Sequence, residues 1–121
     1  MNETIHDALG RGGTIDITTT GRQTGLPRRI EIVFFNFDGR LYISGRPSPR
    51  RRSWLANLAD HPAFTFHLKR PVAADLAATA REVTDPAERR TILARVANAW
   101  RRTDVDTMVE QSPLVEVTIA A

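Results

Sequence analysis

Six segments of this chain have the residue pattern of short β-strands, and turn signals separate them within only 121 residues. Residues 14–20, for example, are rich in threonine and alternate isoleucine with polar residues, which favours a strand. Asp38-Gly39 is a strong signal for a tight hairpin, because both residue types tolerate positive φ. Strands joined by hairpins predict a mostly antiparallel sheet that forms a barrel or is strongly coiled. The expected strands span residues 14–20, 29–37, 41–45, 64–69, 72–83 and 115–119.

Helix signals lie before, between and after these strands. Residues 3–9 predict a short helical piece that the following glycines end. Ser48 can cap a helix that has Pro49 in its first turn, so we expect a short helix from there to about Asp60. Asp85 and Glu88 form a capping box, and the helix that it starts repeats apolar residues on one face.

Positive charge is concentrated between Gly21 and Arg52. This stretch contains eight arginines and two acidic residues, whereas the whole chain has a formal net charge of only +3. Arginine favours forked contacts with phosphate or carboxylate, so the stretch indicates a bound anion, either a small molecule or nucleic acid. Residues 50–52 are all arginine and would fill the first turn of the short helix, where the helix dipole disfavours cations. A bound anion would reverse that penalty; the alternative is that these arginines simply point into solvent.

The composition excludes several classes of function. The chain has no cysteine, so disulfides, thiolate metal sites and a cysteine nucleophile are excluded, and a reducing cytoplasm fits. No apolar run approaches the roughly 18 residues of a membrane span. The three histidines lack the spacing of metal ligands, so no metal is expected. Neither a glycine-rich dinucleotide motif nor a serine nucleophile elbow is present.

Two motifs resemble a known family. Residues 18–28, with the sequence TTTGRQTGLPR, resemble the strand–turn–strand opening of the deazaflavin-dependent nitroreductase family. That family belongs to the FMN-binding split β-barrel proteins, which are related to pyridoxamine-phosphate oxidase. Residues 53–58, SWLANL, followed by His61-Pro62, are similar to the short helix that follows the family's third strand. The resemblance implies a mainly β (α+β) fold, a six-stranded antiparallel split β-barrel with two short helices, in a single domain over residues 1–121.

The resemblance also implies an activity. Such a protein is an oxidoreductase that uses the deazaflavin coenzyme F-420 (F420) and transfers hydride to a small organic acceptor such as a nitro compound, quinone or enone. Relatives are homodimers with the pocket at the subunit boundary. Because the coenzyme carries the hydride, no catalytic side chain is predicted. By position, the resemblance implies that the following residues bind the cofactor: Gln23, Thr24, Arg28, Ser44, Gly45, Arg46, Arg51, Arg52 and Trp54.

Two departures from the family pattern leave alternatives open. Gln23 stands where the family often has lysine, and the loop after Gly45 is rich in arginine and proline rather than glycine. The alternatives are FMN in place of F420, or a non-catalytic carrier of a flavin or deazaflavin. Nucleic-acid binding through residues 46–52 is the third reading, but no aromatic residues interleave with these arginines to stack on bases. We therefore expect a small-molecule substrate and no nucleic-acid partner.

Overall fold

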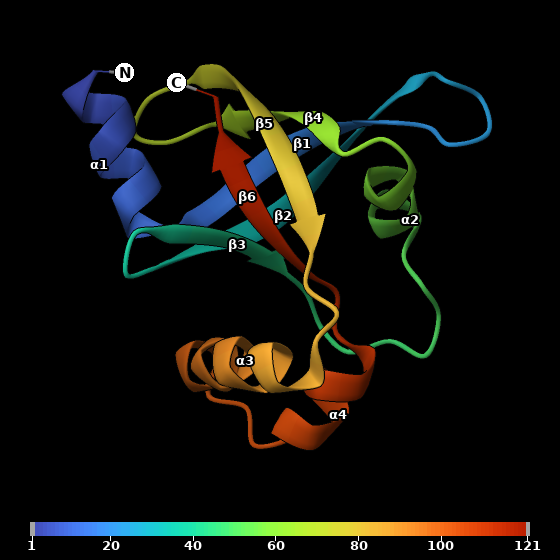
Figure 1. Ribbon diagram of the computed structural model, residues 1–121. Helices are drawn as coiled ribbons and strands as arrows, with labels where there is room; N and C mark the ends of the chain where they lie inside the picture. The colour runs from blue at the N-terminus through green and yellow to red at the C-terminus, as the bar shows by residue number, and fades with distance from the viewer. Residues whose placement is uncertain (1, 121) are drawn as a thin grey trace.

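The computed structural model describes residues 2–120, and within them it contains six strands and four helices (Figure 1). Along the chain, a helix is followed by three strands, a second helix, two further strands, two helices and a final strand. The elements are α1 (Glu3–Arg11), β1 (Gly13–Thr20), β2 (Pro27–Phe37), β3 (Arg40–Ser44), α2 (Ser53–Asp60), β4 (Ala63–Leu68), β5 (Ala74–Glu82), α3 (Pro86–Trp100), α4 (Val105–Gln111) and β6 (Leu114–Ile119).

The six strands form one closed antiparallel barrel in the order β1-β2-β3-β6-β5-β4. The barrel closes where β4 pairs with β1, with Ile17 opposite Phe66. Between β2 and β3, Asp38 and Gly39 have φ angles of 57° and 89°, which is the geometry that a tight hairpin requires. The predicted antiparallel barrel is therefore confirmed, and each strand end lies within two residues of its expected place.

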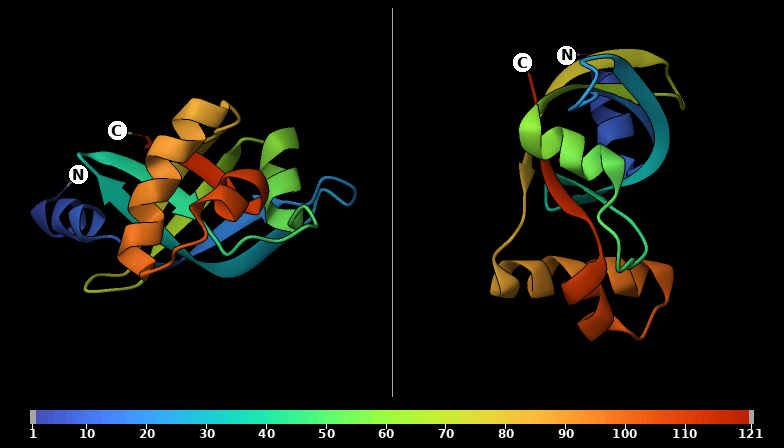
Figure 2. Two further views of the ribbon diagram at one scale, coloured as in Figure 1. Left: turned by 90° about the horizontal axis from the view of Figure 1, so that it is seen from below. Right: turned by 90° about the vertical axis from the view of Figure 1, so that its right-hand side faces the viewer.

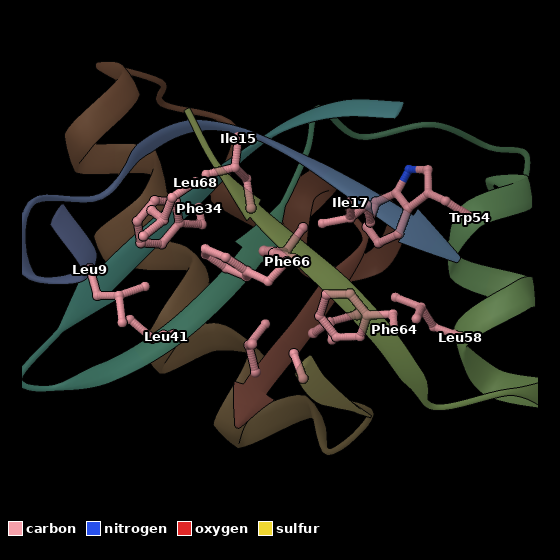
Figure 3. Packing of buried hydrophobic residues seen from close by; sticks show 14 of the residues in the cluster. Leu9, Ile15, Ile17, Phe34, Leu41, Trp54, Leu58, Phe64, Phe66 and Leu68 are labelled. Carbon is pink, nitrogen blue, oxygen red and sulfur yellow. The ribbon is translucent and has the colours of Figure 1, made fainter. Parts of the chain in front are cut away.

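The barrel interior is filled by apolar side chains (Figure 3). Phe34 and Phe66 meet edge to face with their ring centres 5.1 Å apart. Ile15 and Ile17 point into the same core and are almost completely buried. Because side chains occupy this space, a ligand has to bind at the outside or the rim of the barrel.

Helices lie at both ends of the barrel and against one side of it (Figures 1 and 2). α1 and α2 lie at opposite ends, and both contribute side chains to the barrel core, among them Leu9 and Trp54. α3 and α4 lie together on the outside, where Leu93 and Met108 pack with Phe35 of β2 in a second apolar cluster. Between residues 2 and 120, no helix combines the length and the apolar character needed to cross a membrane.

The helices differ from the prediction in two respects. The short helix α2 begins at Ser53 with Arg52 as its N-cap, not at Pro49 with Ser48 as its cap. The Ser48 hydroxyl instead accepts a hydrogen bond from the Arg50 amide at 3.2 Å, which forms a local turn ahead of the helix. In addition, the described residues contain four helices rather than two, because α1 is a complete helix and α4 was not predicted.

Candidate functional site

The turn between β1 and β2 is attached to α2 by one buried asparagine. Asn57 is only 4% exposed, and its Oδ1 accepts hydrogen bonds from the Arg22 amide at 3.1 Å and from Arg22 Nη1 at 3.0 Å. Its Nδ2 donates to the Thr19 hydroxyl at 3.2 Å. Within the turn, a β-carbon on Gly21 would lie 2.7 Å from Thr24 Oγ1, so the tight packing requires glycine. The β1–β2 turn therefore has a fixed position beside α2.

A cavity of about 710 Å³ lies between this turn and α2, and we call it the turn cavity. Three arginines line it: Arg22, Arg28 and Arg52. Glu31 is the one acidic residue in its lining, and Lys69 Nζ engages that carboxylate at 2.6 Å. Within residues 2–120, Arg28 makes no ion pair with a carboxylate. The turn cavity thus has surplus positive charge, which suits an anionic group.

A second cavity of about 600 Å³ adjoins the first, and we call it the tryptophan cavity. The end of β3 forms one wall through Ser44 and Gly45, and the two indole rings of Trp54 and Trp100 contribute to the lining. The two cavities share Glu31, Arg52 and Trp54 as lining residues, so they adjoin. Together they form an elongated site with arginines at both ends, Arg22 and Arg28 in the turn cavity and Arg46 and Arg102 in the tryptophan cavity, and the two tryptophans lie at the second end.

Arg52 stands where the two cavities meet. Its Nη2 donates to the Arg46 carbonyl at 2.6 Å, and no carboxylate of residues 2–120 lies within ion-pair distance of it. Burial lowers the pKa of the Arg52 guanidinium, although arginine stays charged at any ordinary pH. A β-carbon on Gly45 would lie 3.6 Å from the guanidinium carbon, an ordinary contact distance, so the Arg52 side chain lies directly against Gly45. A partly desolvated cation without a counter-ion is stabilised by a bound anion.

Ser44 and Trp54 shape the walls rather than offer free polar groups. Ser44 is 1% exposed, and its hydroxyl donates to the Pro113 carbonyl at 2.7 Å. Trp54 is 8% exposed and belongs to the same core cluster as Ile17 (Figure 3). Both residues are therefore fixed by the fold, which gives the tryptophan cavity rigid sides.

The structure brings most of the predicted site residues together. The following eight line the two adjoining cavities: Gln23, Thr24, Arg28, Ser44, Gly45, Arg46, Arg52 and Trp54. Arg51 lies apart from them, because its guanidinium makes two hydrogen bonds of 2.9 Å to the Glu82 carboxylate. That carboxylate raises the pKa of Arg51. Arg51 lines a separate cavity on the other side of this segment.

Sequence reasoning missed other residues of the site. Asn57 left a weak signal, since it is an amide on an otherwise apolar face of a predicted helix. Trp100 and Arg102 also line the tryptophan cavity, yet they come from the end of α3 and the connection to α4. Trp100 is the last residue of α3, and the path to Arg102 passes through the left-handed backbone of Arg101, with φ of 55°, which no residue pattern in the sequence indicated.

The site provides cations, backbone groups and aromatic walls. No group of three or more histidine and acidic side chains between residues 2 and 120 is arranged to hold a metal ion. The histidines lie outside the lining of both cavities. Such an arrangement binds and orients an elongated molecule with an anionic part and a planar apolar part, and it offers little acid–base chemistry of its own.

Comparisons with known proteins agree with this geometry. A family model described as F420H(2)-dependent quinone reductase matches residues 3–119. A solved F420 reductase is 17% identical and has a TM-score of 0.74, covering 100% of this chain and 97% of its own. A conserved hypothetical protein from Mycobacterium tuberculosis is 19% identical with a TM-score of 0.73, covering 100% and 82%. An F420-H2 dependent reductase is 19% identical with a TM-score of 0.63, covering 88% and 94%. At these identities the solved structures establish the shared fold.

Proposed function

The chain belongs to the F420H(2)-dependent quinone reductase family, and from that premise we propose how it holds its coenzyme and what it reduces. It is a deazaflavin-dependent oxidoreductase with F420 as its cofactor. The bound coenzyme supplies the hydride for reduction of a small organic acceptor. The residues of this chain therefore have to bind the coenzyme, orient its ring toward the acceptor and shield the reacting atoms from water. The observation that carries the proposal is Arg52, a partly desolvated cation without a carboxylate partner among residues 2–120 at the junction of two cavities.

The turn cavity suits the anionic tail of the cofactor. Arg28 and Arg52 would donate charge-assisted hydrogen bonds to its phosphate, since neither guanidinium is engaged by a carboxylate of this chain between residues 2 and 120. Gln23 and Thr24 lie in the same lining and offer an amide and a hydroxyl. Arg22 contributes positive charge, but Asn57 already holds it in place. In this proposal the arginines replace the lysine that the family often has at position 23.

The tryptophan cavity suits the planar ring. Ser44 and Gly45 would border the ring through their backbone, because the Ser44 side chain is engaged by Pro113. Trp54 would close the cavity from α2, and Arg46 would lie at its exposed margin. The two tryptophans and the fixed backbone of Ser44 and Gly45 would hold the ring in place and limit the access of water to its reacting face, which favours hydride transfer to an acceptor over side reactions.

We assign the acceptor to the part of the tryptophan cavity that Trp100 and Arg102 line. An indole ring offers a flat apolar surface to a quinone or a nitroaromatic compound. Arg102 makes a two-pronged ion pair with Asp104, at 2.9 and 2.6 Å, so its charge is largely compensated. A neutral planar acceptor fits this lining better than a strongly anionic one.

Three further expectations belong to the proposal: the dimer and the single domain follow from the resemblance, and the cytoplasmic location follows from the absence of cysteine. The chain forms a homodimer, resides in the cytoplasm, and holds its site in a single domain over residues 1–121. Analytical ultracentrifugation of the purified protein at several concentrations tests the dimer. A constant mass of one chain would contradict it.

Titration with F420, followed by fluorescence, tests the main proposal. We expect saturable binding of F420, and oxidation of the reduced coenzyme when a quinone or a nitro compound is added. FMN serves as the comparison ligand, and tighter binding of FMN would contradict the cofactor assignment to these cavities. Binding of F420 without turnover on any acceptor would indicate a carrier. Retention on DNA that salt abolishes, together with no cofactor binding, would indicate a nucleic-acid binder.

A further inference from the structure

A third cavity lies beside the arginine-rich segment, and it shares Arg52 with the two cavities already assigned. It has a volume of about 330 Å³, and residues 48–52, the end of β5 and the end of α4 line it. A hydrogen bond from the Ser48 amide to the Gln111 carbonyl, at 3.1 Å, holds the segment against α4. Figure 1 shows this connection passing from the end of β3 near α4 to the start of α2. We call this space the α4 cavity.

Four arginines contribute to the lining of the α4 cavity: Arg50, Arg51, Arg52 and Arg89. The acidic residues in the lining are Glu82 and Glu110. Arg51 already neutralises Glu82 through two hydrogen bonds, which leaves three arginines against one exposed carboxylate. The lining therefore has a positive surplus even after its internal ion pair is taken into account.

Arg89 is the most unusual of these cations. Its guanidinium donates to the backbone carbonyls of Val83 at 3.0 Å, Val109 at 2.9 Å and Ser112 at 2.6 Å, and no carboxylate of residues 2–120 lies within ion-pair distance. Desolvation lowers the pKa of this group. By binding carbonyls near the end of α4, Arg89 also offsets the negative end of that helix. The cavity floor is thus electrostatically favourable to an anion.

Ser112 supplies an independent observation that points to a ligand. Ser112 is 4% exposed, and its hydroxyl is buried without any hydrogen-bond partner among the described residues. The Ser112 amide is bound to the Met108 carbonyl and its own carbonyl to Arg89, so the hydroxyl is its one unused polar group. Buried polar groups are nearly always paired, and Ser112 lines the α4 cavity.

We propose that the α4 cavity is a second anion site, which takes an oxyanion group with the charge and hydrogen-bonding capacity of phosphate. The Ser112 hydroxyl would donate to one oxygen at the floor, and Arg50 would donate from the rim, since it is not committed to a carboxylate. Arg89 contributes charge, because carbonyls occupy most of its donors. Arg52 lines all three cavities, so an anion in the α4 cavity lies close to the site proposed for F420.

Inorganic phosphate is the probe for the test, titrated into the cofactor-free protein in chloride buffer and followed by calorimetry. We expect saturable binding that Ser112→Ala and Arg50→Ala each weaken by about tenfold, which is the effect of losing one charge-assisted hydrogen bond. Arg90→Ala is the matched control, because Arg90 neighbours Arg89 on α3 but pairs with Asp106 outside the cavity. Without phosphate, Ser112→Ala should melt no lower than the unaltered protein, since its hydroxyl has no protein partner to lose.

Two results would overturn the proposal. One is the absence of saturable phosphate binding. The other is binding that Arg28→Ala weakens while Ser112→Ala leaves it unchanged, because phosphate would then occupy the turn cavity. Repeating the titration with saturating F420 identifies the source of the oxyanion. If phosphate still binds in the presence of F420, the natural ligand of the α4 cavity is a separate compound that carries phosphate. If F420 displaces phosphate and Ser112→Ala also weakens F420 binding, the natural ligand is the acidic tail of the cofactor.

Discussion

Arg81 and Arg52 show two opposite environments for the same side chain. Arg81, on β5, donates to Glu116 at 3.0 and 2.9 Å and to Glu88 at 2.6 and 3.2 Å, and these carboxylates raise its pKa. Arg52, ahead of α2, has only the Arg46 carbonyl as a partner, and burial lowers its pKa. Through these ion pairs Arg81 links β5 to β6 and α3, so its charge is neutralised within the fold.

The difference separates arginines with a structural role from those that we propose to bind the ligand. On the outer face of β1, β2 and β4, Asp16 accepts hydrogen bonds from Arg29 and Lys69, both at 2.9 Å, and these bonds lower the pKa of Asp16. Around the turn and tryptophan cavities, Arg28 and Arg52 have no such carboxylate among residues 2–120. Local positive charge in a sequence therefore indicates a ligand only after the arginines with acidic partners have been set aside.

The strongest test of this distinction removes an unpaired arginine. Arg52→Ala should weaken F420 binding by roughly 1.5–3 kcal/mol, or about tenfold to a hundredfold, since it deletes a charge-assisted hydrogen bond in a desolvated place. Arg28→Ala should act in the same direction. Fluorescence titration measures both, with Arg40→Ala as the exposed control outside the two cavities. Unchanged affinity in both variants would remove the assigned site.

The next test concerns the residue that positions the turn. Asn57→Ala should lower the free energy of unfolding by about 1–3 kcal/mol, because Arg22 and Thr19 each lose a buried partner. F420 affinity should fall as well, although no charge is removed, since the turn is no longer held. Urea denaturation and fluorescence titration measure these effects, with exposed Asn98→Ala as the matched control. Full affinity in a destabilised Asn57 variant would argue against the positioning role.

Removing the paired arginine should have a smaller effect of a different kind. Arg81→Met should lower stability by about 1 kcal/mol, because Arg81 is half exposed and surface ion pairs contribute little individually. F420 affinity should stay the same, since Arg81 lies outside the lining of both cavities. A clear loss of affinity in Arg81→Met would break the distinction between the two groups.

The smallest effect is a change of stability with pH. Arg81 lowers the pKa of Glu88 relative to the unfolded chain, and Arg29 and Lys69 do the same for Asp16. A carboxyl with a depressed pKa in the folded state stabilises the fold above its unfolded pKa, and this contribution is lost as the pH falls through the folded value. Urea denaturation should therefore show stability falling from about pH 5 to about pH 3. In Arg81→Met that slope should be shallower; an identical slope would exclude Glu88 as a contributor.

The sequence predicted the barrel because its strands follow local rules. The Asp38-Gly39 hairpin and the alternation of β4 each depend on neighbours in the chain, so their patterns are visible without a structure. The Asp85 cap was also predictable, and its carboxylate accepts from the Glu88 amide at 2.9 Å. The Glu88 carboxylate, however, binds Arg81 and not the helix end, because an ion pair from β5 is within reach.

The candidate site was less accessible to sequence reasoning, because its geometry depends on long-range contacts. The helix α2 begins at Ser53 and not at Pro49, and the residues ahead of it make other contacts: Arg51 with the Glu82 carboxylate and Arg52 with the Arg46 carbonyl. The separation of Arg51 from its neighbour Arg52 follows from the same contacts. No residue pattern distinguishes these two arginines, so a resemblance assigned both to one pocket.

The closed and filled barrel has a consequence for how specificity can diverge. Trp100 and Arg102, which we propose to border the acceptor region, lie at or beyond the end of α3 and take no part in strand pairing, although the Trp100 ring packs edge to face against Phe35 of β2 with ring centres 5.4 Å apart. Substitutions in this connector can retune substrate choice while the hydrogen-bonded ladder stays intact. Substrate recognition can therefore change, by natural selection or by engineering, while the strand pairing of the barrel is retained. This is consistent with proteins less than 20% identical sharing this architecture.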